Sequence, residues 1–174
     1  MFQHKMIQTF IEKQFCIFCM NDEYFKIIDL EKHETRDNKD QHVNGSLTVV
    51  WRDLDNIIKD EFKMIYVTSV NPGEIKGPHL HTKRNSCFVC IHGEVVFVIQ
   101  KKSGEYEEIR TNADKPVVIV IPKNVPAAHI NINDGVSRVL TLADLSWKPN
   151  DDEMSNVSFN DYDWNKWKKT KPPN

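Results

Sequence analysis

Short runs of apolar and β-branched residues, separated by turn residues, dominate the middle of the chain. The runs cover residues 46–51, 62–70, 87–100, 117–121 and 138–142. The turn residues between them are Asn71-Pro72-Gly73, Ser103-Gly104 and Asn133-Asp134-Gly135. Short strands at this spacing are typical of an all-β sandwich or barrel. The turn at His92-Gly93 separates two strongly apolar halves of one run, which predicts a tight hairpin between them.

The rest of the chain is less regular. Residues 31–44 are highly charged and lack large apolar side chains, so they indicate a loop, and only residues 53–59 look helical. We therefore predict an N-terminal arm at 1–28, a β-barrel at 29–147 and a polar C-terminal extension at 148–174.

Composition and charge narrow the class of protein. The 174 residues are 40% apolar and 28% charged, which suits one globular domain that needs no metal or disulfide to fold. The net charge of −2 argues against a nucleic-acid partner. Lys5, Glu12 and Lys13 interrupt any signal peptide, and no window approaches the roughly 20 apolar residues of a membrane span. These features predict a soluble cytoplasmic protein without a membrane partner.

The four cysteines form two C-x-x-C pairs, Cys16/Cys19 and Cys87/Cys90, which raises the possibility of a zinc site. The residues between the paired cysteines are bulky and apolar, unlike a metal-binding turn. If residues 87–90 form a strand, the two thiols point to opposite faces and cannot share an ion. We therefore expect buried, reduced cysteines.

The chemistry-bearing segment contains His79 and His81, two residues apart. On a strand, residues at this spacing share a face, so both imidazoles would point into one barrel interior. They could hold a divalent metal together with His129, or one could act as a general base, since the unperturbed pKa of an imidazole is about 6.5. The alternative is that the pair is only polar residues near a strand end and that His129 lies in a loop and contacts nothing.

The segment resembles the first cupin motif, with Gly73, His79, His81 and Gly93 in register. The acid of that motif is absent, because Asn85 or Ser86 occupies its place. Pro122, His129 and Asn133 resemble the second motif with a longer spacing. The resemblance implies a cupin jelly-roll barrel.

Residues 29–164 further resemble the cupins that act on nucleotide-activated 4-keto-6-deoxy sugars, above all the dTDP-4-dehydrorhamnose 3,5-epimerase-like group and the related 3,4-ketoisomerases. The matching pieces are N-G-S-L-T at 44–48, I-K-G-P-H-L-H at 75–81, G-E-V at 93–95, I-P at 121–122, W-K-P-N-D-D-E at 147–153 and F-N-D-Y-D-W at 159–164. The resemblance implies C3 or C5 epimerisation by proton abstraction next to the ketone, or a 3,4-ketoisomerisation, with no metal or other cofactor.

The resemblance also implies roles for individual residues. His79 falls on the catalytic base, and His81 on the second histidine of the ketoisomerases. Lys76 takes the place of an arginine that contacts the diphosphate. The other substrate-binding candidates are Arg84, Tyr66, Thr68 and Trp147. Tyr66 and Thr68 could instead be ordinary sheet residues, and Trp147 could close the barrel mouth.

The chain departs from the classical epimerases at several positions. Their tyrosine general acid should fall near Leu140 or Thr141, their lysine is replaced around Phe88, and Trp147 stands where they have tyrosine. A metal-dependent oxygenase and a sugar-binding cupin without catalysis therefore stay open as alternatives. The family resemblance implies a homodimer, for which residues 15–20 are the expected cross-subunit element.

Overall fold

The computed structural model describes residues 24–52 and 61–168. Twelve strands and one short 3-10 helix (η2) form its regular structure. The strands are β1 (Lys26–Asp29), β2 (Lys32–Arg36), β3 (Val43–Thr48), β4 (Met64–Val70), β5 (Ile75–His81), β6 (Ser86–His92), β7 (Glu94–Gln100), β8 (Tyr106–Asn112), β9 (Val117–Ile121), β10 (Ala127–Asn131), β11 (Ser137–Ala143) and β12 (Met154–Asn156), and η2 covers Trp164–Trp167.

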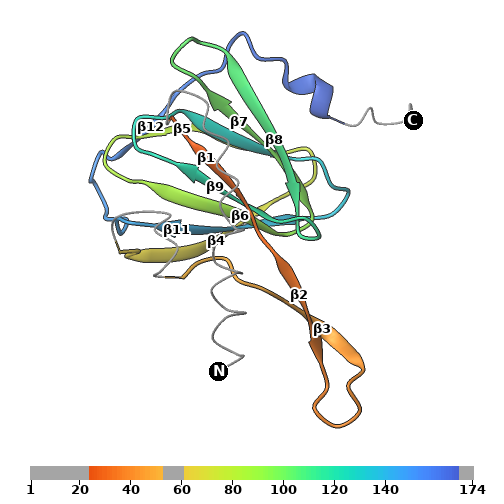
Figure 1. The fold of residues 1–174 in the computed structure, drawn as a ribbon. Coiled ribbons are helices and arrows are strands. Elements are labelled where there is room, and N and C mark those ends of the chain that lie inside the picture. The colour runs from red at the N-terminus through yellow and green to blue at the C-terminus, as the bar shows by residue number, and fades with distance from the viewer. Residues whose placement is uncertain (1–23, 53–60, 169–174) are drawn as a thin grey trace.

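Two antiparallel five-stranded sheets face each other and form a barrel (Figure 1). One sheet has the strand order β1-β9-β6-β11-β4, and the other has the order β12-β5-β10-β7-β8. Apolar side chains from both sheets, such as Phe97 and Ile119, fill the space between them. The all-β barrel that the sequence predicts is confirmed.

Strand β7 shows why its sequence is apolar without alternation. Phe97 faces the core between the sheets, whereas Val96 and Val98 face a second core with Phe159 and Tyr162 of the C-terminal segment. Both faces of this strand are therefore buried, as expected for a strand between two packed layers. The polar C-terminal extension thus carries the aromatic residues that cover this sheet.

The predicted hairpin at His92-Gly93 is wrong. β6 pairs with β11 and β9, whereas β7 pairs with β10 and β8, so the turn carries the chain from one sheet to the other. Gly93 has a φ of +74°, and a Cβ there would lie 3.1 Å from the Cα of Ser137. The turn residues in the sequence indicate where β6 ends and β7 begins. They do not indicate whether these two strands pair with each other or with strands of different sheets.

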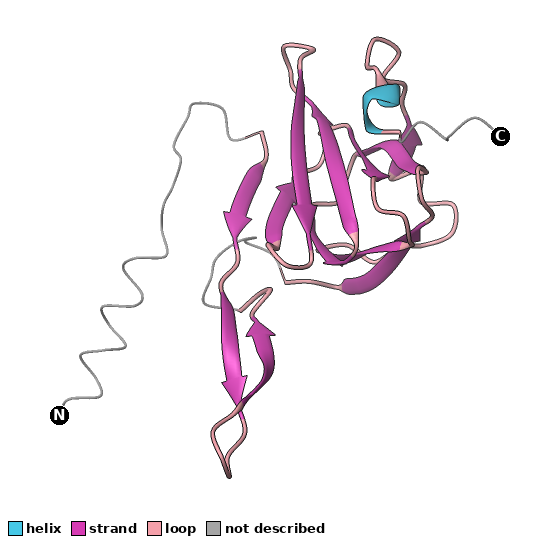
Figure 2. Ribbon diagram, turned by 90° about the vertical axis from the view of Figure 1, so that its right-hand side faces the viewer, coloured by secondary structure: helices cyan, strands magenta, loops and turns pink. Residues whose placement is uncertain are grey.

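The predicted loop at 31–44 is also wrong in part. β2 and β3 pair as an antiparallel hairpin that projects away from the barrel (Figures 1 and 2). Both faces of this hairpin are largely solvated, so its strands lack the apolar alternation from which strands are recognised in a sequence.

Cys87 and Cys90 are buried free thiols that lie in different cores, as their spacing predicts. The expected helix at 53–59, the cysteines at 16 and 19 and the segment 15–20 lie outside the described residues. The three-part division of the chain stays a prediction. No helix in the described ranges has the length and apolarity of a membrane span.

Candidate active site

A cavity of about 200 Å³ opens between the two sheets. Six of the seven predicted site residues line it: Tyr66, Thr68, Lys76, His79, His81 and Arg84. Tyr66 and Thr68 come from β4 in one sheet, whereas the histidines come from β5 in the other. The fold therefore places the candidate residues on opposite walls of one space.

A bulge in β5 brings Lys76 to the same face as the histidines. Lys76 pairs with His129 of β10, and His79 pairs with Ala127, so two residues of β5 lie opposite Ala128 alone. Without the extra residue, Lys76 and His79 would point to opposite faces, because they are three positions apart. Gly77 in the bulge has a φ of +92° and lies so close to β10 that a Cβ would be 2.9 Å from a carbonyl oxygen.

His79 receives its orientation from the C-terminal segment. Its Nδ1 lies 3.0 Å from Oδ1 of Asn156 in β12, which pairs with β5. An amide oxygen only accepts hydrogen bonds, so this contact assigns the proton to Nδ1. The lone pair of the neutral ring is then on Nε2, the nitrogen that a base would use.

His81 has a different environment. Its Nδ1 lies 3.0 Å from Oε2 of Glu153, and Nη2 of Arg84 lies 2.8 Å from its Nε2 and 3.2 Å from its Nδ1. A nitrogen so close to both ring nitrogens lies over the ring, not in line with one lone pair. Burial, followed by the charge of Arg84, lowers the pKa of His81, although the carboxylate of Glu153 opposes this.

Arg84 and Glu153 form a buried ion pair beside the cavity. Their closest charged atoms are 3.5 Å apart, and only 7% and 5% of their side chains are exposed. Each charge stabilises the other, because burying either charge without its partner would cost several kcal/mol of folding free energy. With His81 they form a cluster in which Glu153 and Arg84 both contact this imidazole.

His129 lies in β10 and not in a loop, so the expectation that it contacts nothing is wrong. Its ring packs against Phe97 with centroids 4.9 Å apart, and it is 8% exposed at the cavity wall. Burial lowers its pKa to about 4, with smaller contributions from Lys76 and His79. Its Nε2 has no hydrogen-bond partner among the described residues. A neutral imidazole with an unused nitrogen therefore lines the cavity.

Trp147 does not line this cavity but a neighbouring groove of about 470 Å³. Tyr66, Arg84 and Met154 line both spaces, so the groove extends the cavity outward. Trp147 is 64% exposed and has Lys148 beside it in the groove lining. An exposed indole next to cations is suited to stacking on a flat ring that carries phosphate.

Sequence reasoning missed Asn156 and Glu153. Both lie more than 70 positions from the histidines that they contact, on a strand of three residues. The D-D-E run at 151–153 and the N at 156 contain the right residue types, but no spacing rule connects them with β5. The only signal that could have found them was the family resemblance of this segment.

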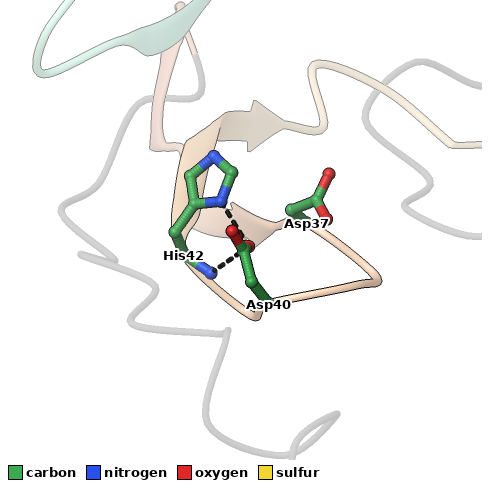
Figure 3. Close-up of side chains that lie close together, drawn as sticks. All are labelled: Asp37, Asp40 and His42. Atoms are coloured by element: carbon green, nitrogen blue, oxygen red, sulfur yellow. Dashed lines mark hydrogen bonds and ion pairs between the residues drawn. The ribbon is translucent and has the colours of Figure 1, made fainter.

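Metal binding by the three histidines has little geometric support. In the described part of the chain, only Asp37, Asp40 and His42 bring three possible ligand atoms within 4.8 Å of one another. Figure 3 shows this group on the exposed loop between β2 and β3. The distances between the three cavity imidazoles do not meet the same criterion.

The barrel of two facing antiparallel sheets, with a histidine pair on an inner strand, defines the class: the protein is a cupin. A family model described as "FdtA: WxcM-like, C-terminal" matches residues 23–164. The chain belongs to this family, which confirms the resemblance seen in the sequence. A comparison with curated proteins finds no match.

Solved structures share the fold at low sequence identity. A dTDP sugar isomerase from Desulfovibrio desulfuricans G20 is 18% identical with a TM-score of 0.68, and the match covers 82% of this chain and 92% of that one. QdtA, a sugar 3,4-ketoisomerase from Thermoanaerobacterium thermosaccharolyticum in complex with TDP, is 21% identical with a TM-score of 0.59, covering 76% and 88%. The capsular polysaccharide assembling protein CapF from Staphylococcus aureus is 23% identical with a TM-score of 0.53, over 56% of this chain but only 27% of CapF.

Proposed function

We propose that this protein is an isomerase of a nucleotide-activated 4-keto-6-deoxy sugar that removes a proton from the carbon next to the ketone. The observation that carries the proposal is the geometry of His79: it lines the cavity, and Asn156 holds its Nδ1 so that Nε2 carries the lone pair. The family supports the substrate class, and so do the solved relatives named a dTDP sugar isomerase and a sugar 3,4-ketoisomerase.

The first step is proton abstraction by His79. The C4 ketone acidifies the hydrogens on C3 and C5, so a neutral imidazole can take one of them. The C–H bond breaks, an N–H bond forms at Nε2, and the electron pair moves into an enolate with its charge on the ketone oxygen. A positioned base of this kind contributes roughly 10²–10⁴-fold to a rate.

The enolate oxygen needs a hydrogen-bond donor in a site that excludes water. His129 is the candidate donor: its neutral imidazole lines the cavity, and its buried Nε2 has no hydrogen-bond partner among the described residues. Because burial lowers the pKa of this histidine to about 4, its ring stays neutral over the range where enzymes usually work.

The nucleotide is proposed to bind where the cavity widens into the groove. Lys76 and Arg84 provide positive charge for the diphosphate, and Trp147 provides a surface on which the base can stack. Thr68 shares the inner face of β4 and lies within reach of a ligand in the cavity. In this arrangement the histidines and Lys76 of β5 line the cavity, and Trp147 lines the groove outside it.

Epimerisation is favoured over 3,4-ketoisomerisation by the state of His81. A ketoisomerase moves a proton between two positions and would draw on both histidines, but Glu153 lies 3.0 Å from Nδ1 of His81 and the guanidinium of Arg84 covers its ring. We therefore expect His81→Ala to retain much more proton exchange than His79→Ala. An equal loss in both variants would favour the ketoisomerase.

The test is incubation with a set of nucleotide 4-keto-6-deoxy sugars in deuterated water. We expect solvent deuterium at C3 or C5 with the wild type and none with His79→Asn, which should keep its nucleotide affinity. Lys76→Ala should show the reverse profile, with weaker binding and a smaller effect on exchange. No exchange by the wild type on any of these sugars would contradict the proposed function.

We also propose a homodimer formed through the outer face of β4. This strand is at the edge of its sheet, and Ile65 and Val67 on its outer face are 63% and 48% exposed. Exposed apolar residues on an edge strand are typical of a surface that pairs with another chain. Light scattering should report a dimer for the wild type and a monomer for Ile65→Lys. A monomeric wild type would contradict the proposal.

A further inference from the structure

Inversion at a sugar carbon requires two groups on opposite sides of the ring. If His79 removes a proton from one face, it can return that proton only to the same face, which restores the starting sugar. A second group must deliver a proton from the other side. We propose that Tyr66 is this proton donor, an inference that rests on the proposed epimerase function.

The two sheets place Tyr66 across the cavity from His79. Tyr66 lies in β4 at the edge of one sheet, and His79 lies in β5 of the facing sheet. On β4, partly buried residues alternate with the exposed Ile65 and Val67, so Tyr66 faces inward. Both side chains line the same cavity. A sugar ring bound there lies between the imidazole and the phenol.

The hydroxyl of Tyr66 is free to act on a ligand. Within the described part of the chain it makes no hydrogen bond, in contrast to the hydroxyls of Tyr106 and Tyr162. The guanidinium carbon of Arg84 lies 6.0 Å from the centre of the Tyr66 ring. Arg84 and Tyr66 thus lie side by side on the wall of the same cavity.

The register of β4 places Tyr66 beside a position where the family resemblance leads one to expect a tyrosine that this chain lacks. Tyr66 pairs with Thr141 of the neighbouring strand β11, and cross-strand partners share a face. Thr141 is one of the two positions at which the resemblance to epimerases leads to an expected tyrosine. The phenol of Tyr66 on β4 is thus directly adjacent to the position of Thr141 on β11.

The proposed step is balanced in atoms and electrons. The O–H bond of Tyr66 breaks and a C–H bond forms on the face opposite His79, using the electron pair of the enolate, so the ketone is restored. His79 then carries one extra proton and Tyr66 lacks one. Exchange of both groups with water returns the site to its starting state, and no oxidant or reductant is needed.

Tyr66→Phe tests proton donation separately from proton abstraction by His79, because the substitution removes only the hydroxyl. We expect deuterium exchange at C3 or C5 to stay within about threefold of the wild type, since His79 still removes and returns a proton on one face. Inversion should fall by roughly 10²-fold or more, the usual effect of losing a positioned acid. Tyr106→Phe, which changes a tyrosine outside the cavity, is the matched control and should leave both rates unchanged.

The outcomes distinguish this inference from the proposed function. An unchanged inversion rate in Tyr66→Phe would overturn the role of Tyr66 while leaving the isomerase intact. Equal losses of exchange and inversion, in a variant whose thermal melt and dTDP affinity match the wild type, would also overturn it, because an acid that acts only on the second face does not control abstraction. If the wild type itself exchanges no sugar proton, the proposed function fails first.

Discussion

Acidification should destabilise this protein strongly through one buried residue, His129. In the folded state burial lowers the pKa of His129 to about 4, against an ordinary value of 6.5. Between these two values the unfolded chain binds a proton that the folded protein does not. Because stability rises with pH wherever the unfolded state binds more protons, it must fall as the pH drops from about 6.5 toward 4.

The size of this loss of stability follows from the pKa of His129 in the folded state and its ordinary pKa. Each unit of difference in pKa corresponds to about 1.4 kcal/mol, so His129 should remove about 2 kcal/mol of folding free energy at pH 5 and about 3 kcal/mol at pH 4, relative to pH 7.5. The groups that face this imidazole are Lys76 and His79, and their Coulombic interactions with it also oppose its protonation. A loss of this size is a large part of the roughly 5–15 kcal/mol that stabilises a typical domain.

Urea unfolding, followed by tryptophan fluorescence at pH 7.5, 6, 5 and 4, measures how the free energy of unfolding depends on pH. His129→Leu introduces an apolar side chain of similar size and removes both the titration and the unpartnered nitrogen, so it should be at least as stable as the wild type at pH 7.5. Between pH 7.5 and 4 it should lose about 3 kcal/mol less than the wild type. His33→Leu, at an exposed position, is the control that should retain the wild-type pH dependence. Parallel pH curves for the wild type and His129→Leu would refute the reasoning.

Three further predictions follow from the packing. Gly77→Ala should destabilise the protein by roughly 1–3 kcal/mol in urea unfolding, because the residue has a φ of +92° and a Cβ would lie 2.9 Å from a carbonyl oxygen of β10; an unchanged midpoint would contradict the bulge geometry. Tyr162→Phe should cost about 1 kcal/mol, since its hydroxyl donates a 2.8 Å hydrogen bond to a carboxylate of β8, and a more stable variant would count against that bond. Burial raises the pKa of Cys87 to about 12 and of Cys90 to about 11, so peptide mass spectrometry should find neither alkylated by iodoacetamide at pH 8 until urea is added; labelling of the folded protein would contradict their burial.

The sequence predicted the fold class and the inward histidine pair because both depend on local periodicity. Two positions on a strand share a face whatever the strand pairs with, so His79 and His81 could be placed together before their neighbours were known. The same reasoning failed at Gly93, because the choice between pairing with the next strand and crossing to the other sheet depends on the whole barrel. It also could not place Lys76, because the bulge at Gly77 changes the face to which the preceding residues point.

The C-terminal segment shows most clearly what local patterns do not contain. Its aromatic residues Phe159 and Tyr162 pack on the outer face of β7, and Trp167 donates a 2.8 Å hydrogen bond to the hydroxyl of Tyr162. Packing of this kind fixes the path of the chain that precedes it, and β12 lies on that path. The proton of His79 is thus assigned by Asn156, whose own position depends on a core on the far side of the sheet. A polar segment with few apolar runs therefore belongs to the candidate site, because it supplies the different hydrogen-bond partners of the two histidines.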